Sequence, residues 1–133
     1  MLISNLSNIE MYLNVSNNIL RGPIPPQISE LTMVEAIDLS NNQLSGGVHV
    51  TLVGCKNLDL LDLFANNLTD SLPPDLFPLL AFLTSLSVSG NDLNGEIPSN
   101  IIVALKCVQS VDLSRNAFTG VIPQGLANLM CIF

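Results

Sequence analysis

Apolar residues recur along the chain in short alternating pairs, and successive pairs begin about two dozen residues apart. In each pair one polar residue separates two aliphatic ones: Leu13 and Val15, Ile37 and Leu39, Leu61 and Leu63, Leu86 and Val88, and Val111 and Leu113. Residues two apart point to the same side of an extended chain, so each pair predicts a short strand with one buried side. The same strand in every repeat, running in the same direction, predicts a parallel sheet.

An asparagine follows each predicted strand and marks the phase of the repeat. The asparagines are Asn18, Asn42, Asn66, Asn91 and Asn116, at spacings of 24, 24, 25 and 25 residues. The fragments around them, such as VSNNILRGPIP and VSGNDLNGEIP, fit one template, L-x-x-L-x-L-x-x-N-x-L-x-G-x-I-P. An Asn side chain carries two donors and an acceptor, so we expect it to satisfy backbone groups of its own turn and of the neighbouring coil. The period predicts a solenoid whose coils bury their apolar sides on one another.

The second half of each repeat predicts a short helical turn that faces inward. Apolar residues three apart follow the Ile-Pro segment: Ile28 and Leu31, Leu52 and Cys55, Leu76 and Leu79, Ile101 and Ala104, and Leu126 and Leu129. We therefore predict one α/β solenoid domain over residues 1–133, a curved stack of about five coils of 24–25 residues. The parallel sheet lies on its concave face and the short turns on its convex face. The expected coils are 10–33, 34–57, 58–82, 83–107 and 108–131, with partial repeats and uncapped ends at both sides.

Composition and charge exclude several classes of function. The formal net charge of -7 leaves nothing to neutralise a run of phosphates, which argues against nucleic-acid binding. The chain has one histidine and three cysteines and shows no HExxH, GxSxG or P-loop pattern, so we expect no enzyme and no cofactor. His49 lacks an acidic or cysteine partner at metal-ligand spacing, and we expect no metal site but a surface loop. The longest apolar stretch is far short of the roughly 18–20 residues that a membrane span needs, and the first ten residues do not resemble a signal peptide.

The template resembles the plant-type extracellular leucine-rich repeat, whose distinguishing mark is the GxIP segment. Gly22 to Pro25, Gly95 to Pro98 and Gly120 to Pro123 carry that segment, whereas Asp70 replaces the expected glycine and His49 the expected proline. In this family the repeats form the extracellular, ligand-reading part of receptor-like kinases and receptor-like proteins, and also polygalacturonase inhibitors. The stretch 57–129 is similar to the last repeats of grass flagellin-sensing receptor kinases.

The resemblance implies a non-catalytic module that recognises a peptide or protein, in signalling or plant defence, with a co-receptor kinase as a further partner. It also implies an extracellular or plasma-membrane location for the family, although the family's signal peptide, capping segments, membrane helix and kinase are not found here. We therefore expect a slice of a longer ectodomain. An inhibitor of polygalacturonases and a truncated gene product without a function of its own stay open as alternatives.

The outward-facing strand positions give the candidate ligand-binding surface. The candidates on the concave face are Tyr12, Glu35, Asp38, Leu60, Asp62, Phe64 and Asp112. Leu60 and Phe64 are large and apolar where a solvated strand normally carries small or polar residues, and the acids around them resemble the polar surround of a binding hot spot. We expect a ligand with a basic residue beside an apolar one. The alternatives are that the acids are ordinary solvated side chains, or that Phe64 folds over the sheet edge or packs on Leu60 alone.

Sequons and cysteines give further candidate sites. Asn5, Asn14 and Asn67 are potential N-glycosylation sites if the chain is secreted. Cys55 falls in a core-facing column and is expected to be a buried free thiol. Cys107 and Cys131 are expected on adjacent coils, about 4.8 Å apart, a separation that allows a disulfide.

Overall fold

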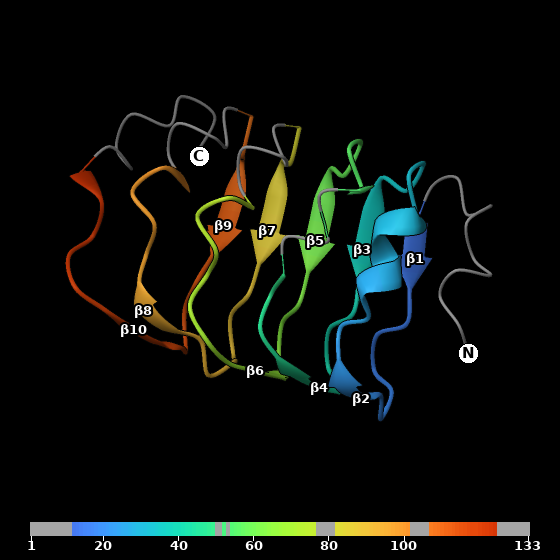
Figure 1. Ribbon diagram of the computed structural model, residues 1–133, viewed down its shortest axis with the longest axis horizontal. Helices are drawn as coiled ribbons and strands as arrows, with labels where there is room; N and C mark the ends of the chain where they lie inside the picture. The colour runs from blue at the N-terminus through green and yellow to red at the C-terminus, as the bar shows by residue number, and fades with distance from the viewer. Residues whose placement is uncertain (1–11, 50–51, 53, 77–81, 102–106, 125–133) are drawn as a thin grey trace.

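The structure is a computed structural model and describes residues 12–49, 52, 54–76, 82–101 and 107–124. Its main sheet has five parallel strands in the order β1-β3-β5-β7-β9, which lie side by side along the long axis of the molecule (Figure 1). These strands are β1 (Tyr12–Asn14), β3 (Ala36–Asp38), β5 (Leu60–Asp62), β7 (Ser85–Ser87) and β9 (Ser110–Asp112). The predicted parallel-strand solenoid is confirmed.

The register of the main sheet follows the repeat. The central residue of each strand pairs with the central residue of the next, through Leu13, Ile37, Leu61, Leu86 and Val111. The flanking residues of each strand are more exposed than its central residue, as alternation along a pleated strand requires. Each strand therefore presents its two flanking residues on one outer surface.

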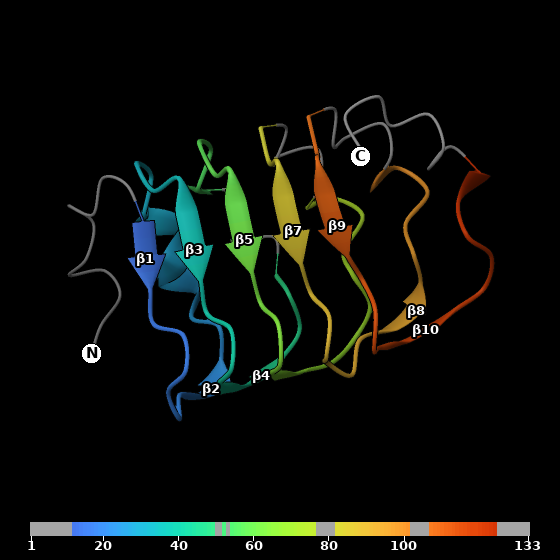
Figure 2. The same ribbon diagram turned by 180° about the vertical axis from the view of Figure 1, so that it is seen from behind.

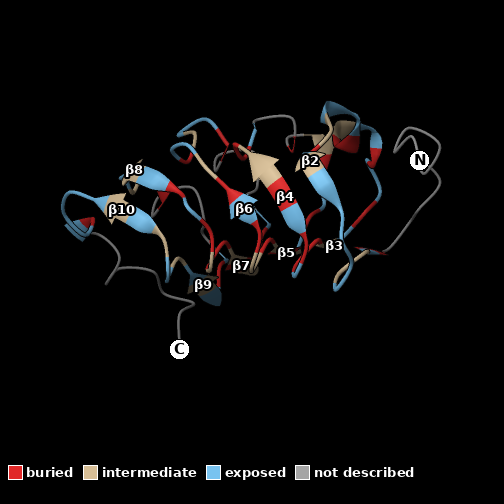
Figure 3. Ribbon diagram, turned by 90° about the horizontal axis from the view of Figure 1, so that it is seen from below, coloured by how far each residue is buried: buried red, intermediate tan, exposed pale blue. Residues whose placement is uncertain are grey.

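A second set of short parallel strands, which the sequence pattern did not predict, lies on the other side of the core (Figure 3). One group has the order β2-β4-β6 and the other pairs β10 with β8; the strands are β2 (Arg21–Pro23), β4 (Gln43–Gly46), β6 (Asn67–Leu68), β8 (Asn94–Glu96) and β10 (Ala117–Thr119). Arg21 pairs with Gln43, so partners are two positions closer in sequence than the repeat length. Between the two groups, Ser71 and Asn94 form an isolated parallel bridge.

Short 3-10-type turns connect the second strands back to the main sheet. The first coil contains a 3-10 helix, η2 (Pro26–Glu30). Its backbone hydrogen bond from Ile28 to Pro25, from residue i+3 to residue i, recurs in later coils: Leu52 to His49, Leu76 to Pro73 and Ile101 to Pro98. Ile28, Leu31, Leu52, Cys55, Leu76 and Ile101 are buried as predicted. Leu79, Ala104, Leu126 and Leu129 lie outside the described residues.

The asparagine column joins neighbouring coils as predicted. The Asn66 Nδ2 donates to the carbonyl oxygens of Leu39 (3.0 Å) and Leu63 (3.2 Å), and its Oδ1 accepts from the amide of Leu44 (3.0 Å). Asn42, Asn91 and Asn116 repeat this pattern in their own coils. Each of these side chains therefore satisfies a donor and an acceptor of the coil before it, which ties the stack together.

The core lies between the two sets of strands and is aliphatic, but it is not uniform along the stack (Figure 3). The apolar residue two positions after the asparagine is buried at Leu44, Leu68 and Leu93. Leu20 is instead 42% exposed, and Phe118 is only half-buried. Both belong to the outermost coils that the structure describes, where a described neighbour covers the coil on one side only. Within the described ranges, no helix has the length and apolar character needed to cross a membrane.

Candidate ligand-binding surface

The strands β1, β3, β5, β7 and β9 lie side by side in one sheet (Figure 2), and their outward side chains are here called the strand face. Register divides it into two rows. The first row runs through Tyr12, Ala36, Leu60, Ser85 and Ser110, and the second through Asn14, Asp38, Asp62, Ser87 and Asp112. The strand face is thus a ladder of side chains with one step for each coil, spaced about 4.8 Å apart.

The structure places the predicted site residues at different depths. Tyr12 is 67% exposed, and Glu35 and Asp112 are also exposed. Asp38, Leu60, Asp62 and Phe64 are half-buried. Four of the candidates come together at the centre, because Leu60, Asp62 and Phe64 share one coil and Asp38 pairs in register with Asp62. Tyr12 and Asp112 lie two coils away on opposite sides of this central group.

Leu60 is the only large aliphatic side chain in the first row of the strand face. Its partners in register are Ala36 on one side and Ser85 on the other. Both neighbours are small, so the Leu60 side chain stands beside them half-exposed instead of packing among large residues. Leu60 is therefore available to an apolar group that approaches the strand face.

Phe64 lies two residues after the end of β5, and its ring reaches toward the following coil. A Cβ atom built on Gly90 would lie 3.3 Å from the Phe64 Cε2 atom. Gly90 has a positive φ of 67°, and the corresponding residues of the other coils are Asn17, Asn41, Ala65 and Arg115, all with positive φ. The ring therefore rests against the one coil in which this position has no side chain. Phe64 is neither in the core nor confined to contact with Leu60.

The acids of the strand face differ in how their oxygens are bonded. The Asp38 Oδ1 accepts from the backbone amide (2.9 Å) and the hydroxyl (2.6 Å) of Ser40. Asp112 accepts the same pair of hydrogen bonds from Ser114, at 3.0 and 2.6 Å. Asp62 accepts from the backbone amide of Phe64 at 2.9 Å, and the phenylalanine has no hydroxyl to add a second bond.

Electrostatics separate Asp62 from Asp112 in the same way. Burial raises the pKa of Asp62, the backbone hydrogen bond from Phe64 lowers it, and the charges of Asp38 and Asp112 raise it. The net direction is upward from 3.8. Hydrogen bonds from the side chain and backbone of Ser114 lower the pKa of Asp112 below 3.8. The two acids therefore respond to their surroundings in opposite directions.

The part played by Gly90 and the missing serine beside Asp62 were not recognised in the sequence. The signal was present, because the residue two positions after the strand end is serine in four coils, at Ser16, Ser40, Ser89 and Ser114, and phenylalanine in the central one. That Gly90 makes room for the ring depends on which residues of adjacent coils meet, which the repeat template alone does not give.

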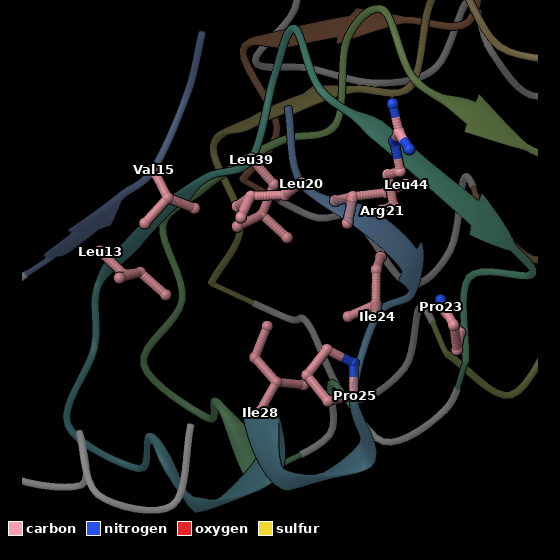
Figure 4. A pocket seen from close by; sticks show the side chains of 10 residues that line it. All are labelled: Leu13, Val15, Leu20, Arg21, Pro23, Ile24, Pro25, Ile28, Leu39 and Leu44. Atoms are coloured by element: carbon pink, nitrogen blue, oxygen red, sulfur yellow. The ribbon is translucent and has the colours of Figure 1, made fainter. Parts of the chain in front are cut away.

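A cavity of about 250 Å³ lies inside the first described coils, away from the strand face. Figure 4 shows its lining, which is aliphatic apart from Arg21; the residues are Leu13, Val15, Leu20, Arg21, Pro23, Ile24, Pro25, Ile28, Leu39 and Leu44. Six of these side chains belong to the hydrophobic core or pack against it, and the lining includes no acid, histidine or cysteine. In the described ranges, no cluster of three or more histidines, cysteines or carboxylates could hold a metal ion.

The structure describes two of the three cysteines. Cys55 is a buried free thiol within 3.4 Å of the Ile28 carbonyl oxygen, and burial raises its pKa to about 11. Cys107 is exposed as a free thiol, and Cys131 lies outside the described residues, so their disulfide stays a prediction.

The exposed sequon asparagines lie on different surfaces. Asn14 lies on the strand face and Asn67 on β6, while Asn5 lies outside the described residues. His49 is exposed, as a loop position predicts.

Comparison with known proteins agrees with this architecture. The Leucine Rich Repeat family model matches residues 11–31, 57–79, 82–102 and 107–129, which is more than half of the chain. No curated protein sequence matches the chain.

Solved structures of plant receptors are similar to it. A chain of the PEPR1–AtPEP1 structure is 34% identical to this chain, with a TM-score of 0.85. The aligned region covers 90% of this chain and 17% of that one. The ectodomain of the Arabidopsis receptor kinase HAESA, in complex with an extended IDA peptide hormone, is 30% identical with a TM-score of 0.88 and covers 97% of this chain and 22% of its own. The BIR3–SERK2 complex from Arabidopsis thaliana is 32% identical, with a TM-score of 0.82, over 87% of this chain and 61% of its own.

This chain therefore spans between about a sixth and three fifths of the length of those proteins. The family match, the parallel solenoid and the plant ectodomains among its structural neighbours agree on one assignment. The chain belongs to the leucine-rich repeat family, and its repeats are of the plant extracellular type.

Proposed function

We propose that the chain is a recognition module without catalytic chemistry, and that it binds a peptide or protein through the strand face. It would act as part of a plant receptor-like kinase or receptor-like protein ectodomain, outside the cell, in signalling or defence. In this proposal the coils are 10–33, 34–57, 58–82, 83–107 and 108–131, and the ligand-contacting residues are Tyr12, Glu35, Asp38, Leu60, Asp62, Phe64 and Asp112.

One observation carries the proposal: the central coil departs from its own repeat at two outward positions. Leu60 and Phe64 are half-exposed and apolar where the neighbouring coils carry Ala36, Ser85 and serine. Neither side chain belongs to the buried core cluster, so packing of the core gives no reason for them. Large apolar residues on a solvated face, with acids beside them, are typical of a binding hot spot.

The structural neighbours support the class of partner. HAESA is seen with an IDA peptide hormone, PEPR1 with AtPEP1, and BIR3 with SERK2. Each of these chains is longer than the one described here, so a co-receptor kinase is proposed as a partner of the complete receptor and a peptide as the ligand of this segment.

A selection experiment tests the proposal without a known ligand. The chain is offered a random-sequence peptide library displayed on phage, and the enriched peptides are synthesised and measured by isothermal titration calorimetry. Phe64→Ala should weaken their binding by roughly 2 kcal/mol or more, because a truncated hot-spot residue costs about that much. Glu30→Ala, at an exposed position of η2 away from the strand face, is the control and should leave the affinity unchanged.

Circular dichroism of both variants establishes that they fold as the parent does. The proposal fails if no peptide is enriched over background. It also fails if the enriched peptides bind the Phe64→Ala and Leu60→Ser variants as tightly as the unmodified chain.

A further inference from the structure

Asp62 is a carboxylate of the strand face whose second local hydrogen bond has been replaced by an aromatic ring. At the corresponding strand-end positions, the hydroxyls of Ser16, Ser40 and Ser114 donate to the polar side chains two residues before them, at 2.6–2.7 Å. In the central coil Phe64 stands in place of the serine, and Asp62 keeps only the backbone bond at 2.9 Å. A carboxylate has room for about four acceptor interactions, so Asp62 retains capacity for an incoming donor.

The backbone amide of Phe64 donates to this carboxylate, and its ring rests against the next coil. The Cε2 atom lies against Gly90, where any other residue of this row would put a side chain in its way. Phe64 is half-buried, so part of its side chain faces solvent. A supported aromatic residue two positions from a carboxylate with free acceptor capacity is a two-part site.

The charges around the pair are of one sign. The side chains whose charges act on Asp62 are Asp38, its partner in register, and Asp112, two coils away. A cation that binds at Asp62 therefore gains attraction from these acids as well. Charge complementarity selects a basic group as the occupant, and Leu60 in the same coil selects an apolar group beside it.

Among basic side chains, arginine matches both halves of this site. Its planar guanidinium donates in a fork to a carboxylate and stacks on an aromatic face, whereas the ammonium group of lysine is a compact, strongly hydrated charge. We propose that Asp62 and Phe64 bind an arginine side chain of the ligand, with Leu60 contacting an apolar residue next to it. This inference rests on the proposed function, because it names the ligand chemistry of the same surface.

The test uses the phage-displayed random peptide library and three single variants of the full chain. Phe64→Ser restores the serine found in the other coils, and Asp62→Asn removes the charge at nearly constant shape. Asp75→Asn removes an exposed acid from a turn away from the strand face and serves as the charge control. Peptides selected on the parent chain should be enriched in arginine next to an apolar residue, and this enrichment should be lost on Phe64→Ser and Asp62→Asn but kept on Asp75→Asn.

Calorimetry with synthetic analogues sharpens the result. Replacing the arginine of a selected peptide by lysine should weaken binding to the parent chain by roughly tenfold, because the charge is kept but the planar stacking group is lost. Replacing it by citrulline should weaken binding further, because citrulline keeps a planar group but has no charge to pair with Asp62. Binding of the arginine and lysine peptides to Phe64→Ser should become nearly equal.

Two outcomes overturn this inference and leave the proposed function intact. One is a set of selected peptides that depend on Leu60 but show no preference for arginine. The other is an arginine preference that survives both Phe64→Ser and Asp62→Asn. Failure of the parent chain to select any peptide overturns the proposed function and this inference together.

Discussion

The central coil and the last described coil contain equivalent residues at equivalent positions, yet they are buried to different extents. In the central coil Leu61, Leu63, Leu68 and Leu72 are at most 2% exposed. Their counterparts in the last coil are Val111, Leu113 and Phe118, which are half-buried, and Ile122, which is 75% exposed. The template decides which side chains point inward, but burial comes from the coils on both sides.

The largest contrast between the two coils is expected from removing a core leucine. Leu63→Ala should lower the free energy of unfolding by about 3–5 kcal/mol, because Leu63 is fully buried and the cavity cannot close. Leu113→Ala, at the equivalent position of the last coil, should cost no more than about half as much because Leu113 is already partly solvated. Urea denaturation followed by circular dichroism measures both losses. Equal losses would show that the two coils are buried alike in solution.

Substitutions in the asparagine column should also lower the free energy of unfolding more in the central coil than in the last described coil, with smaller losses than those of the leucines. Asn66→Ala leaves the buried amide of Leu44 and the carbonyl of Leu39 without partners, at a cost of about 3 kcal/mol. Asn116→Ala exposes the corresponding groups of Leu93 and Val88 in a half-buried setting, where water replaces part of the loss, and should cost about 1 kcal/mol.

The same denaturation measurement applies to both asparagine variants. Asn66→Asp provides a shape-matched check: it keeps the acceptor but removes the donors, so it should be at least as destabilising as Asn66→Ala. A harmless Asn66→Asp would contradict the role assigned to the amide nitrogen.

The backbone of the central coil carries a strain that can be relieved. Asp70 has a φ of 69°, at the position where Gly22, Gly46, Gly95 and Gly120 occur in the other coils. Asp70→Gly should therefore stabilise the chain by about 0.5 kcal/mol, since a left-handed conformation is costlier for a residue with a Cβ. Gly46→Ala is the reverse substitution in the preceding coil, where a Cβ meets nothing closer than 3.7 Å, and should cost about 1 kcal/mol. Thermal denaturation should shift in opposite directions for the two variants.

The smallest expected effect is a difference in pH dependence between Asp62 and Asp112. The pKa of Asp62 is raised in the folded chain, so the folded chain binds the Asp62 proton more tightly than the unfolded chain does. The free energy of unfolding therefore falls as the pH rises above 3.8. The pKa of Asp112 is lowered, so its contribution is present above 3.8 and is lost as pH falls below that value. Asp62→Asn should thus be slightly stabilising at neutral pH and lose this advantage in acid, and Asp112→Asn should show the opposite sign. NMR titration of the two carboxyl groups should find Asp62 protonating first as the pH is lowered.

Much of the fold follows from the sequence because the same pattern of apolar residues and asparagine recurs in five repeats. The alternating pairs give the main sheet with its register, and the asparagine spacing gives the ladder that joins coils. The second set of strands could not be predicted, since Arg21–Pro23 has no alternating pattern and its pairing with Gln43 is shifted by two positions from the repeat. Close approaches between coils were equally hidden: a Cβ on Gly54 would overlap the carbonyl oxygen of Ser29, a contact that only the assembled stack reveals.

Some features of the candidate site likewise follow from the sequence pattern, and others do not. The outward direction of Leu60, Asp62 and Phe64 follows from strand periodicity and was predicted. Their half-burial and the support of the Phe64 ring by Gly90 arise from contacts between residues about two dozen positions apart. Such contacts depend on side-chain rotamers in adjacent coils, which periodicity does not determine. The single hydrogen bond to Asp62 is local, because its donor, the Phe64 amide, lies two residues away.

The asparagine column also allows the number of coils to change by whole repeats. The Nδ2 of Asn91 donates to the Leu63 carbonyl, and its Oδ1 accepts from the Leu68 amide. Deleting the whole coil 58–82 in frame would bring the Leu39 carbonyl and the Leu44 amide to the same asparagine, so the hydrogen bonds of the asparagine column would be kept. Unequal crossing-over between repeats can therefore shorten or lengthen the solenoid by whole coils and still keep the asparagine hydrogen bonds between neighbouring coils.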